Sequence, residues 1–233
     1  MLYDFHTHTF LSDGVLAPIE LIRRALVNGY TCVGIADHAG AGTLESAIGA
    51  ARKDCELAAR HWNIIALPGV ELTHVPAAAI AELAAAAKRA GALYVVVHGE
   101  SPVEPVEPGT ALAAASCPEV DVLAHPGHIT PEVASAAAAN GVFLEVTARQ
   151  GHSLTNGIVV AVGRAAGAKF LVNSDAHRPE DLLTRAQAES VARGAGLDEA
   201  EARQALEENP RELLRRIGLG AVRPDGATGS ILA

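Results

Sequence analysis

Histidine and carboxylate side chains recur along the chain in short groups, each close to the end of an apolar run. They are His6, His8, Asp13, His38, Glu71, His98, His125, Asp175 and His177. Imidazole and carboxylate groups are ligands for zinc, manganese and iron, and no Cys-x-x-Cys pair points to a thiolate site. These donors are too many for a single ion, so the pattern predicts two to three divalent metal ions lying close together.

Two of these groups share a spacing that places both side chains on one face. His6 and His8 are two residues apart, as are Asp175 and His177, and alternate residues of an extended strand point to the same side. Buried carboxylates need compensating positive charge, and Arg178 is the one basic residue directly beside any of these positions. Metal ions would supply that charge.

The elements that must position these groups alternate between short apolar runs and alanine-rich stretches with helical spacing. The predicted strands are 2–5, 32–36, 64–67, 93–97, 120–124, 142–146 and 170–172. The predicted helices are 18–28, 43–62, 76–90, 110–115, 131–140, 155–166 and 179–193, followed by helical pieces at 198–208 and 210–217. Such alternation predicts a parallel sheet, either a barrel or a doubly wound open sheet, and both build their sites at the carboxyl ends of strands.

The same pattern predicts one domain over residues 1–217 and a flexible tail over 218–233. The net charge of −9 and the presence of only three lysines argue against binding to long nucleic acids. The three cysteines form no pairing pattern, no signal peptide is visible, and no apolar run approaches membrane-spanning length. We therefore expect a cytoplasmic protein without a membrane partner, and a homo-oligomer is left open.

The order and types of these groups resemble the motifs of the polymerase and histidinol phosphatase (PHP) family. The matching residues are His6-Thr7-His8 with Asp13, Asp37-His38, His98 and His125, and Asp175-Ala176-His177, with Glu71 as the shared glutamate. The resemblance spans residues 3–177. It implies a distorted (β/α)7 barrel similar to a TIM barrel, with the site at its carboxyl-terminal rim.

The resemblance also implies an assignment of ligands to three ions. The first ion takes His6, His8, Glu71 and Asp175; the second takes Glu71, His98 and His125; the third takes Asp13, His38 and His177. Some family members have histidine at the position of Asp13. The ions would be zinc, manganese or iron, and the residues expected to be catalytic are Glu71, Asp175 and His177.

For the reaction, the resemblance implies a phosphomonoesterase that hydrolyses a small phosphorylated metabolite, similar to histidinol phosphate or a nucleotide, by attack of a metal-bridging hydroxide. Arg149 and Arg178 follow the last two strands, and we expect both to bind the substrate phosphate. Three alternatives are a PHP-type exonuclease or nucleotide phosphodiesterase, a non-catalytic metal-binding barrel, and a binuclear amidohydrolase. Members of the last group commonly bridge their metals through a lysine after strand four, where this chain has His98.

A few further residues lie at the same predicted rim without a settled role. Glu145 either binds metal or holds a neighbouring group in place, and the sequence leaves both open. For His74, His128 and His152 we expect ordinary loop positions.

Overall fold

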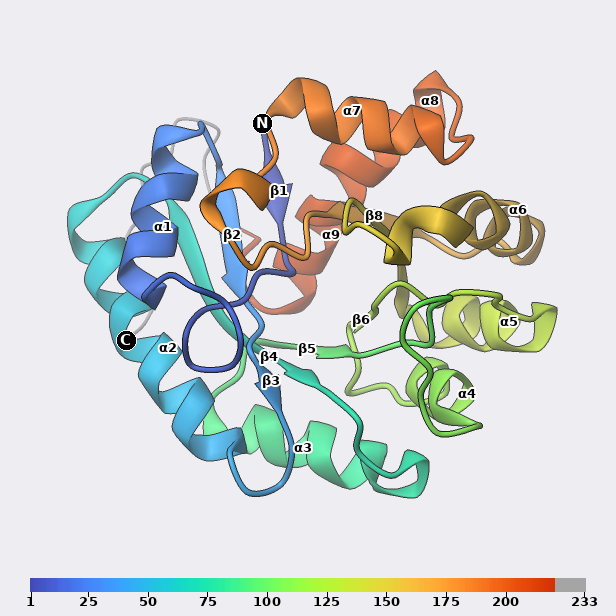
Figure 1. The fold of residues 1–233 in the computed structure, drawn as a ribbon, viewed down its shortest axis with the longest axis horizontal. Coiled ribbons are helices and arrows are strands. Elements are labelled where there is room, and N and C mark those ends of the chain that lie inside the picture. Colours follow the sequence, from blue (N-terminus) through green and yellow to red (C-terminus); the bar gives the residue numbers. More distant parts are fainter. Residues whose placement is uncertain (221–233) are drawn as a thin grey trace.

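Parallel strands form the centre of the molecule, and helices surround them (Figure 1). The computed structural model describes residues 1–220. The strands pair in the order β1 (Tyr3–Asp4), β2 (Cys32–Ile35), β4 (Ile65–Leu72), β5 (Tyr94–Val97), β6 (Val122–Leu123), β7 (Phe143–Thr147) and β8 (Phe170–Asn173). A short additional strand that the sequence pattern missed, β3 (His38–Ala39), pairs with β4.

Helices follow the strands and form a ring around them, which Figure 1 shows from α1 to α7. The helices are α1 (Pro18–Val27), α2 (Leu44–His61), α3 (Ile80–Ala90), α4 (Thr110–Ala115), α5 (Pro131–Asn140), α6 (Asn156–Ala166), α7 (Arg185–Gly194), α8 (Glu199–Arg203) and α9 (Asn209–Arg216). Short 3₁₀ turns are η1 (Ala77–Ala79), η2 (His152–Thr155) and η3 (Pro179–Asp181), and one π-helical turn (η4, Gln204–Glu208) joins α8 to α9.

The first and last strands meet, which distinguishes a barrel from an open sheet. Beyond the ends of β1 and β8, Thr7 and Ala176 form a parallel bridge, and the His8 amide donates to the Ala176 carbonyl at 2.8 Å. Just before it, the Phe5 amide donates to the side-chain oxygen of Asn173 at 2.9 Å. The predicted distorted (β/α)7 barrel is therefore confirmed.

The apolar interior of the barrel follows the period of two that strands impose. Along β4, Ile65 and Leu67 face inward, and Tyr94 of β5 occupies the space beside Gly69. This inner cluster reaches the helix α9, whose Leu213 and Leu214 belong to it together with residues from every long strand. Apolar side chains thus fill the interior at the amino-terminal ends of the strands, and the polar side chains lie at the carboxyl-terminal rim.

Several predicted boundaries differ from the structure. The predicted helix 76–90 is the η1 turn followed by α3, and the predicted strand 120–124 shortens to β6. The predicted helix 179–193 is also two pieces, because the η3 turn ends at Asp181 and a new helix, α7, begins after Thr184, whose side chain forms a capping box with Gln187. The predicted third strand 64–67 is longer: β4 continues to Leu72 and includes Glu71.

The predicted flexible tail over 218–233 starts within the described residues. Leu219 is buried and belongs to the inner apolar cluster, with its amide donating to the Leu214 carbonyl at 2.8 Å. The remainder of that predicted tail, 221–233, lies outside the described residues.

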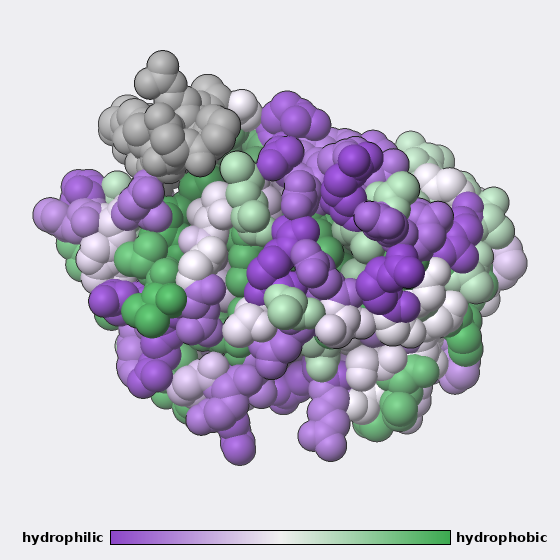
Figure 2. Space-filling view, turned by 90° about the horizontal axis from the view of Figure 1, so that it is seen from above, coloured by the Kyte–Doolittle hydropathy of each residue, from purple (hydrophilic) through white to green (hydrophobic). Residues whose placement is uncertain are grey.

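Hydrophilic side chains dominate the outer surface over α7 and α8, where apolar groups form only small patches (Figure 2). The alanines of α7 that are buried, Ala188 and Ala192, turn toward the protein instead. Within residues 1–220, no helix has the length and apolar character needed to cross a membrane.

The glycines opposite Tyr94 provide a test of the inner packing. A Cβ atom at Gly69 would overlap the Tyr94 ring, which is fully buried, so Gly69→Ala should lower the free energy of unfolding by about 1–3 kcal/mol. Gly49→Ala on α2 is the matched control, since a Cβ there meets nothing within 4 Å, and it should be neutral or stabilise by up to ~1 kcal/mol. Urea unfolding of both variants measures the difference, and equal midpoints would contradict this packing.

Candidate metal centre

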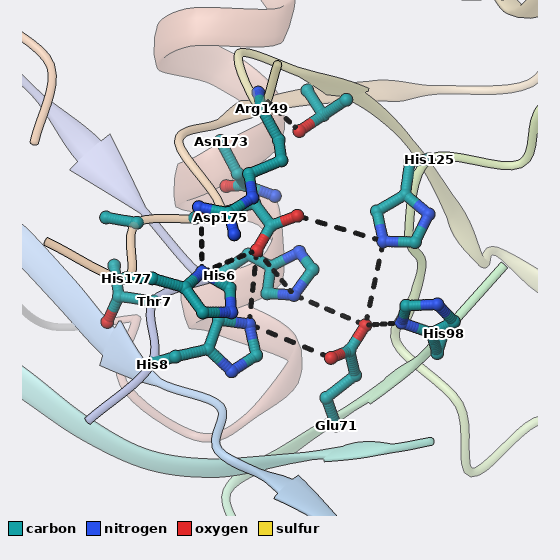
Figure 3. A network of polar contacts seen from close by, with 12 residues as sticks. His6, Thr7, His8, Glu71, His98, His125, Arg149, Asn173, Asp175 and His177 are labelled. Carbon is teal, nitrogen blue, oxygen red and sulfur yellow. Dashed lines mark hydrogen bonds and ion pairs between the residues drawn. The ribbon is translucent and has the colours of Figure 1, made fainter. Parts of the chain in front are cut away.

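All nine predicted ligands lie together at the carboxyl-terminal rim of the barrel. Figure 3 shows six of these histidines and carboxylates pointing toward one another from different strands: His6, His8, Glu71, His98, His125 and Asp175, with His177 beside them. Asp13 and His38 complete the set at its more exposed side. Residues separated by up to 171 positions in the sequence thus share one site.

The bridge that closes the barrel brings the two spaced pairs face to face. His6 and His8 flank Thr7, while Asp175 and His177 flank its partner Ala176. The Nε2 atom of His8 consequently lies 3.2 Å from Oδ1 of Asp175, and its ring lies 4.2 Å from that of His177. The i, i+2 spacing therefore has the predicted effect, although β1 itself ends at Asp4.

Glu71 occupies the middle of the site. Its Oε1 atom lies 3.3 Å from Nε2 of His6, 3.2 Å from Nδ1 of His98 and 3.9 Å from Nε2 of His125. Its other oxygen, Oε2, lies 2.6 Å from Nδ1 of His38. Burial raises the pKa of Glu71, but the charges of His6, His38 and His98 outweigh it and hold that pKa well below its ordinary value. A carboxylate with separate neighbours on each oxygen has the arrangement needed to bridge ions.

A second group of possible ligand atoms lies toward the surface, around the half-exposed carboxylate of Asp13. Its oxygens lie 3.1 Å from Nε2 of His177 and 3.6 Å from Nε2 of His38. Ligand atoms of His8, Asp13, His38 and His177 all fall within 4.8 Å of one another. The three residues predicted for the third ion are therefore adjacent, and His8 joins them.

The loop that carries Asp13 is held by Asp37, a residue whose role the sequence did not reveal. The Asp37 carboxylate accepts hydrogen bonds from the Thr9 amide at 2.6 Å, the Thr9 hydroxyl at 2.7 Å and the Ser12 hydroxyl at 2.7 Å. Burial raises the pKa of Asp37 more than these bonds lower it. Asp37 thus fixes the loop and leaves ligation to its neighbours.

Left-handed backbone conformations among the non-glycine residues of 1–220 occur at His74, His125 and Asp175, all at this rim. Such conformations are uncommon outside glycine and store strain, and they collect at functional sites. Ala124 faces the barrel interior, so a regular strand would direct the next side chain, His125, outward. At a φ of 26°, His125 instead turns inward toward Glu71.

The unpaired ring nitrogens show whether these residues suit a metal. Within residues 1–220, the buried nitrogens without a hydrogen-bond partner include Nε2 of His6, both ring nitrogens of His8 and of His125, and Nε2 of His98. Buried polar atoms normally have partners, so this concentration needs an explanation. Burial also lowers the pKa of His125 to about 3, which leaves its imidazole neutral, as a metal ligand must be. The donor set fits divalent ions.

Glu145 orients its neighbours, which decides between the two roles that the sequence left open. Its Oε1 atom lies 2.8 Å from Nδ1 of His6 and accepts a 2.8 Å hydrogen bond from the Asn173 amide group. Its Oε2 atom accepts a 3.0 Å hydrogen bond from the His125 backbone. A carboxylate on the outer nitrogen of a histidine fixes the tautomer that presents the inner nitrogen to a metal.

Both predicted substrate-binding arginines line one cavity beside the cluster. This cavity of about 550 Å³ is bounded by Arg149, Arg178, Ser174, Asp181 and neighbouring residues. Asp181 connects it to the cluster, since its Oδ2 atom lies 3.4 Å from Nη1 of Arg149 and accepts a 3.0 Å hydrogen bond from the His177 amide. In Figure 3 the Arg149 side chain extends from the end of β7 toward the side of Asp175.

Sequence reasoning missed a group of side chains at the opposite edge of the cluster. Glu104 lies 3.0 Å from His74 and 3.7 Å from His152, so both of these loop histidines contact a carboxylate at this edge. Glu104 follows no strand end and belongs to no motif, and nothing in the sequence singled it out. His128 is exposed and stays outside these groups, as expected.

Comparison with known sequences gives one full-length relative and several partial ones. No family model matches the chain. The 5'-3' exoribonuclease of Haemophilus influenzae is 35% identical over 71 residues, which are 30% of this chain and 23% of that protein. The exoribonuclease Rnm of Salmonella typhimurium is 37% identical over 75 residues, which are 32% of this chain and 24% of that protein.

Among solved structures, the similarity extends over most of the chain at low sequence identity. An amidohydrolase superposes with a TM-score of 0.60 at 16% identity, covering 94% of this chain and 76% of that one. A protein assigned as histidinol phosphatase HisK from Listeria monocytogenes superposes with a TM-score of 0.54 at 11% identity, covering 77% of this chain and 97% of that one. These similarities establish the barrel fold alone.

The full-length relative is the uncharacterized protein MJ1295 of Methanocaldococcus jannaschii. It is 45% identical over 218 residues, which cover 93% of this chain and all of that protein. Identity at this level over a whole chain implies a shared fold and a shared origin. The chain therefore belongs to the same protein family as MJ1295 of Methanocaldococcus jannaschii.

Proposed function

We propose that this protein is a metal-dependent hydrolase of phosphoric ester bonds, of the PHP type, that acts on a small phosphorylated molecule. The observation that carries the proposal is the buried Glu71 carboxylate, whose two oxygens each approach different histidines within 2.6–3.9 Å. Such a centre suits several ions around a shared carboxylate, and closely spaced ions are the usual machinery for hydrolysing phosphoesters.

The ligands divide into the three groups that the PHP resemblance implies. His6, His8, Glu71 and Asp175 would hold one ion, Glu71, His98 and His125 a second, and Asp13, His38 and His177 a third. When bound, these ions would lower the pKa of a water molecule and neutralise charge on the phosphate oxygens. Glu71, Asp175 and His177 are the residues that we propose as catalytic, since they lie where these groups meet.

Two arginines outside the predicted ligand set would orient the substrate. Arg149 and Arg178 line the cavity beside Asp175, and a guanidinium group matches two phosphate oxygens at once. Because Asp181 contacts Arg149 as well as the His177 backbone, the arginine is held in a fixed relation to the cluster. A cavity of about 550 Å³ suits a small phosphorylated metabolite or a mononucleotide.

A second candidate function is a phosphodiesterase or exonuclease acting on short nucleic-acid ends. The partial similarity to 5'-3' exoribonucleases favours it, but it covers less than a quarter of those proteins. The net charge of −9 opposes binding along an extended nucleic acid. A mononucleotide or the end of a short oligonucleotide is compatible with both candidates.

The amidohydrolase alternative lacks the lysine that would bridge its metals. Lys88 contacts Asp121 at 2.6 Å near the start of β6, and Lys169 contacts Glu212 of α9 at 2.6 Å. The remaining lysine, Lys53, lies exposed on α2. None of the three adjoins the metal centre, so we favour phosphoester hydrolysis.

Substitution of Glu71 tests the centre directly. The wild-type protein should contain two to three equivalents of transition metal and hydrolyse p-nitrophenyl phosphate. Glu71→Ala should lower both metal content and kcat/KM, the latter by more than about 10²-fold, because its carboxylate contacts several ligand groups. Elemental analysis and a colorimetric assay measure these quantities. A fully loaded wild-type protein inactive on a broad panel of phosphoesters would contradict the proposed function.

Substitution of Arg149 tests substrate binding separately from metal binding. Arg149→Ala should raise KM by about 10–100-fold, the equivalent of ~1.5–3 kcal/mol for a hydrogen bond to a charged group, with metal content unchanged. Arg23→Ala, an exposed arginine of α1, is the control and should leave KM unaltered. Steady-state kinetics with elemental analysis distinguish the two; an unchanged KM in Arg149→Ala removes this residue from the substrate site.

The charge of Asp175 gives a prediction whose sign depends on metal. Burial raises the pKa of Asp175 to about 7, so its folded-state pKa exceeds its unfolded value and its ionised form destabilises the metal-free protein above that pH. At pH 8 without metal, Asp175→Asn should therefore stabilise the protein by about 1–3 kcal/mol. With zinc or manganese present, the same variant should gain less thermal stability than wild type. Thermal unfolding of both proteins with and without metal measures these two differences. A variant less stable than wild type in both conditions would refute the prediction.

A further inference from the structure

Glu104 lies where three histidines from three different parts of the rim converge. Its Oε1 atom is 3.0 Å from Nε2 of His74 and 3.6 Å from Nε2 of His98, and its Oε2 atom is 3.7 Å from Nε2 of His152. His74 follows β4, His98 follows β5, and His152 opens the η2 turn after β7. One carboxylate thus links three strand ends, although it belongs to none of the predicted ligand groups.

The contact with His98 repeats an arrangement found on the other side of the cluster. His98 directs Nδ1 toward Glu71 at 3.2 Å and Nε2 toward Glu104 at 3.6 Å. His6 directs Nε2 toward Glu71 at 3.3 Å and Nδ1 toward Glu145 at 2.8 Å. In both cases one ring nitrogen faces the shared carboxylate and the other faces a separate carboxylate. The His6–Glu145 pair is within hydrogen-bonding distance, whereas Nε2 of His98 has no hydrogen-bond partner within residues 1–220 and faces Glu104 as an ion-pair contact. A carboxylate that faces the outer nitrogen favours the tautomer with its proton there, which leaves the inner nitrogen free to bind a metal.

Glu104 also acts indirectly on His125, the other histidine assigned to the second ion, because the ring of His152 lies between them. The ring of His152 lies 4.3 Å from the ring of His125, and its Nε2 atom lies 3.7 Å from Oε2 of Glu104. His152 is buried, so its position limits the positions open to His125. Both histidines assigned to the second ion are therefore supported from outside by the same carboxylate.

The loop that carries Glu104 contacts two neighbouring segments, the one that follows β4 and the one that follows β7. The Glu104 amide donates to the Ser101 hydroxyl at 3.1 Å, and the Glu107 carboxylate accepts a 2.7 Å hydrogen bond from the Ala77 amide. Val103 packs against Gly151, the residue before His152. The loop holds the carboxylate over His98 and His152 while leaving its side chain partly exposed.

We propose that Glu104 is a positioning residue for the second ion, holding His98 and, through His152, His125 in the orientation that binds metal. This inference rests on the proposed metal centre and adds to it a dependence on the loop 99–109. Its consequence is selective: loss of Glu104 weakens the second ion and leaves the groups around Asp175 and Asp13 unaffected. Glu145, which faces the outer nitrogen of His6, is fully buried, whereas Glu104 is partly exposed, so the support of the second ion reaches a surface loop.

The test measures metal affinity in the full-length protein without any substrate. Glu104→Gln and Glu104→Asp are titrated with Zn²⁺ and with Mn²⁺ against a chromogenic chelator, alongside wild type. Glu104→Gln should weaken one equivalent by about 10–100-fold, the effect typical of losing a carboxylate behind a ligand, while Glu104→Asp recovers part of it. Activity of Glu104→Gln on p-nitrophenyl phosphate should return toward wild type as the metal concentration rises.

Glu100→Gln is the matched control, since it removes the same charge from the same loop at an exposed side chain. It should leave all metal affinities unchanged, and equal unfolding temperatures show that each variant folds. Unchanged affinities in Glu104→Gln would overturn the inference, and so would permanent loss of a whole equivalent at saturating metal, because Glu104 would then be a ligand. Wild-type protein that binds no metal would instead overturn the proposed function.

Discussion

The site depends on the junction between the two ends of the barrel. The bridge between Thr7 and Ala176 closes the sheet, and it places the residues flanking Thr7 against the residues flanking Ala176. Since those flanking residues are four of the nine predicted ligands, closing the barrel and assembling the centre are one event. An open sheet with the same strands would hold its first and last edges far apart, and His6 and His8 would lose their contacts with Asp175.

A second constraint is electrostatic. Glu71 and Asp175 are buried within a few ångströms of each other's histidine neighbours, yet their pKa values move in opposite directions. Histidine charges on several sides lower the pKa of Glu71, whereas burial raises that of Asp175 to about 7. The protein thus carries a carboxylate whose ionised form is costly without a cation, a feature that opposes stability and suits metal binding.

The barrel interior has an apolar end and a polar end, and this separation follows from how its side chains pack. The lower part is filled by apolar side chains around Tyr94, which occupies the space that Gly34 and Gly69 leave, and α9 covers this end with Leu213 and Leu214. Polar residues could collect at the opposite end because the core beneath them is complete. Carboxylates outside the predicted ligand set then face the outer nitrogens of two predicted ligand histidines: Glu145 at 2.8 Å from Nδ1 of His6, and Glu104 at 3.6 Å from Nε2 of His98.

The seven-fold alternation of strand and helix and the types of the predicted ligands could be read from the chain alone, since short continuous apolar runs and the HxH and DxH spacings are local properties. The short β3 and the full length of β4 depend on pairing with neighbouring strands, which no local pattern carries. The break between η3 and α7 does have a local signal, the capping box of Thr184 and Gln187. Tertiary structure alone decided that Glu145 orients His6, that a left-handed backbone turns His125 inward, and that Glu104 meets three histidines. The contacts of Glu145 and Glu104 join residues that belong to different strands or loops, and the folded barrel brings them within 4 Å of one another.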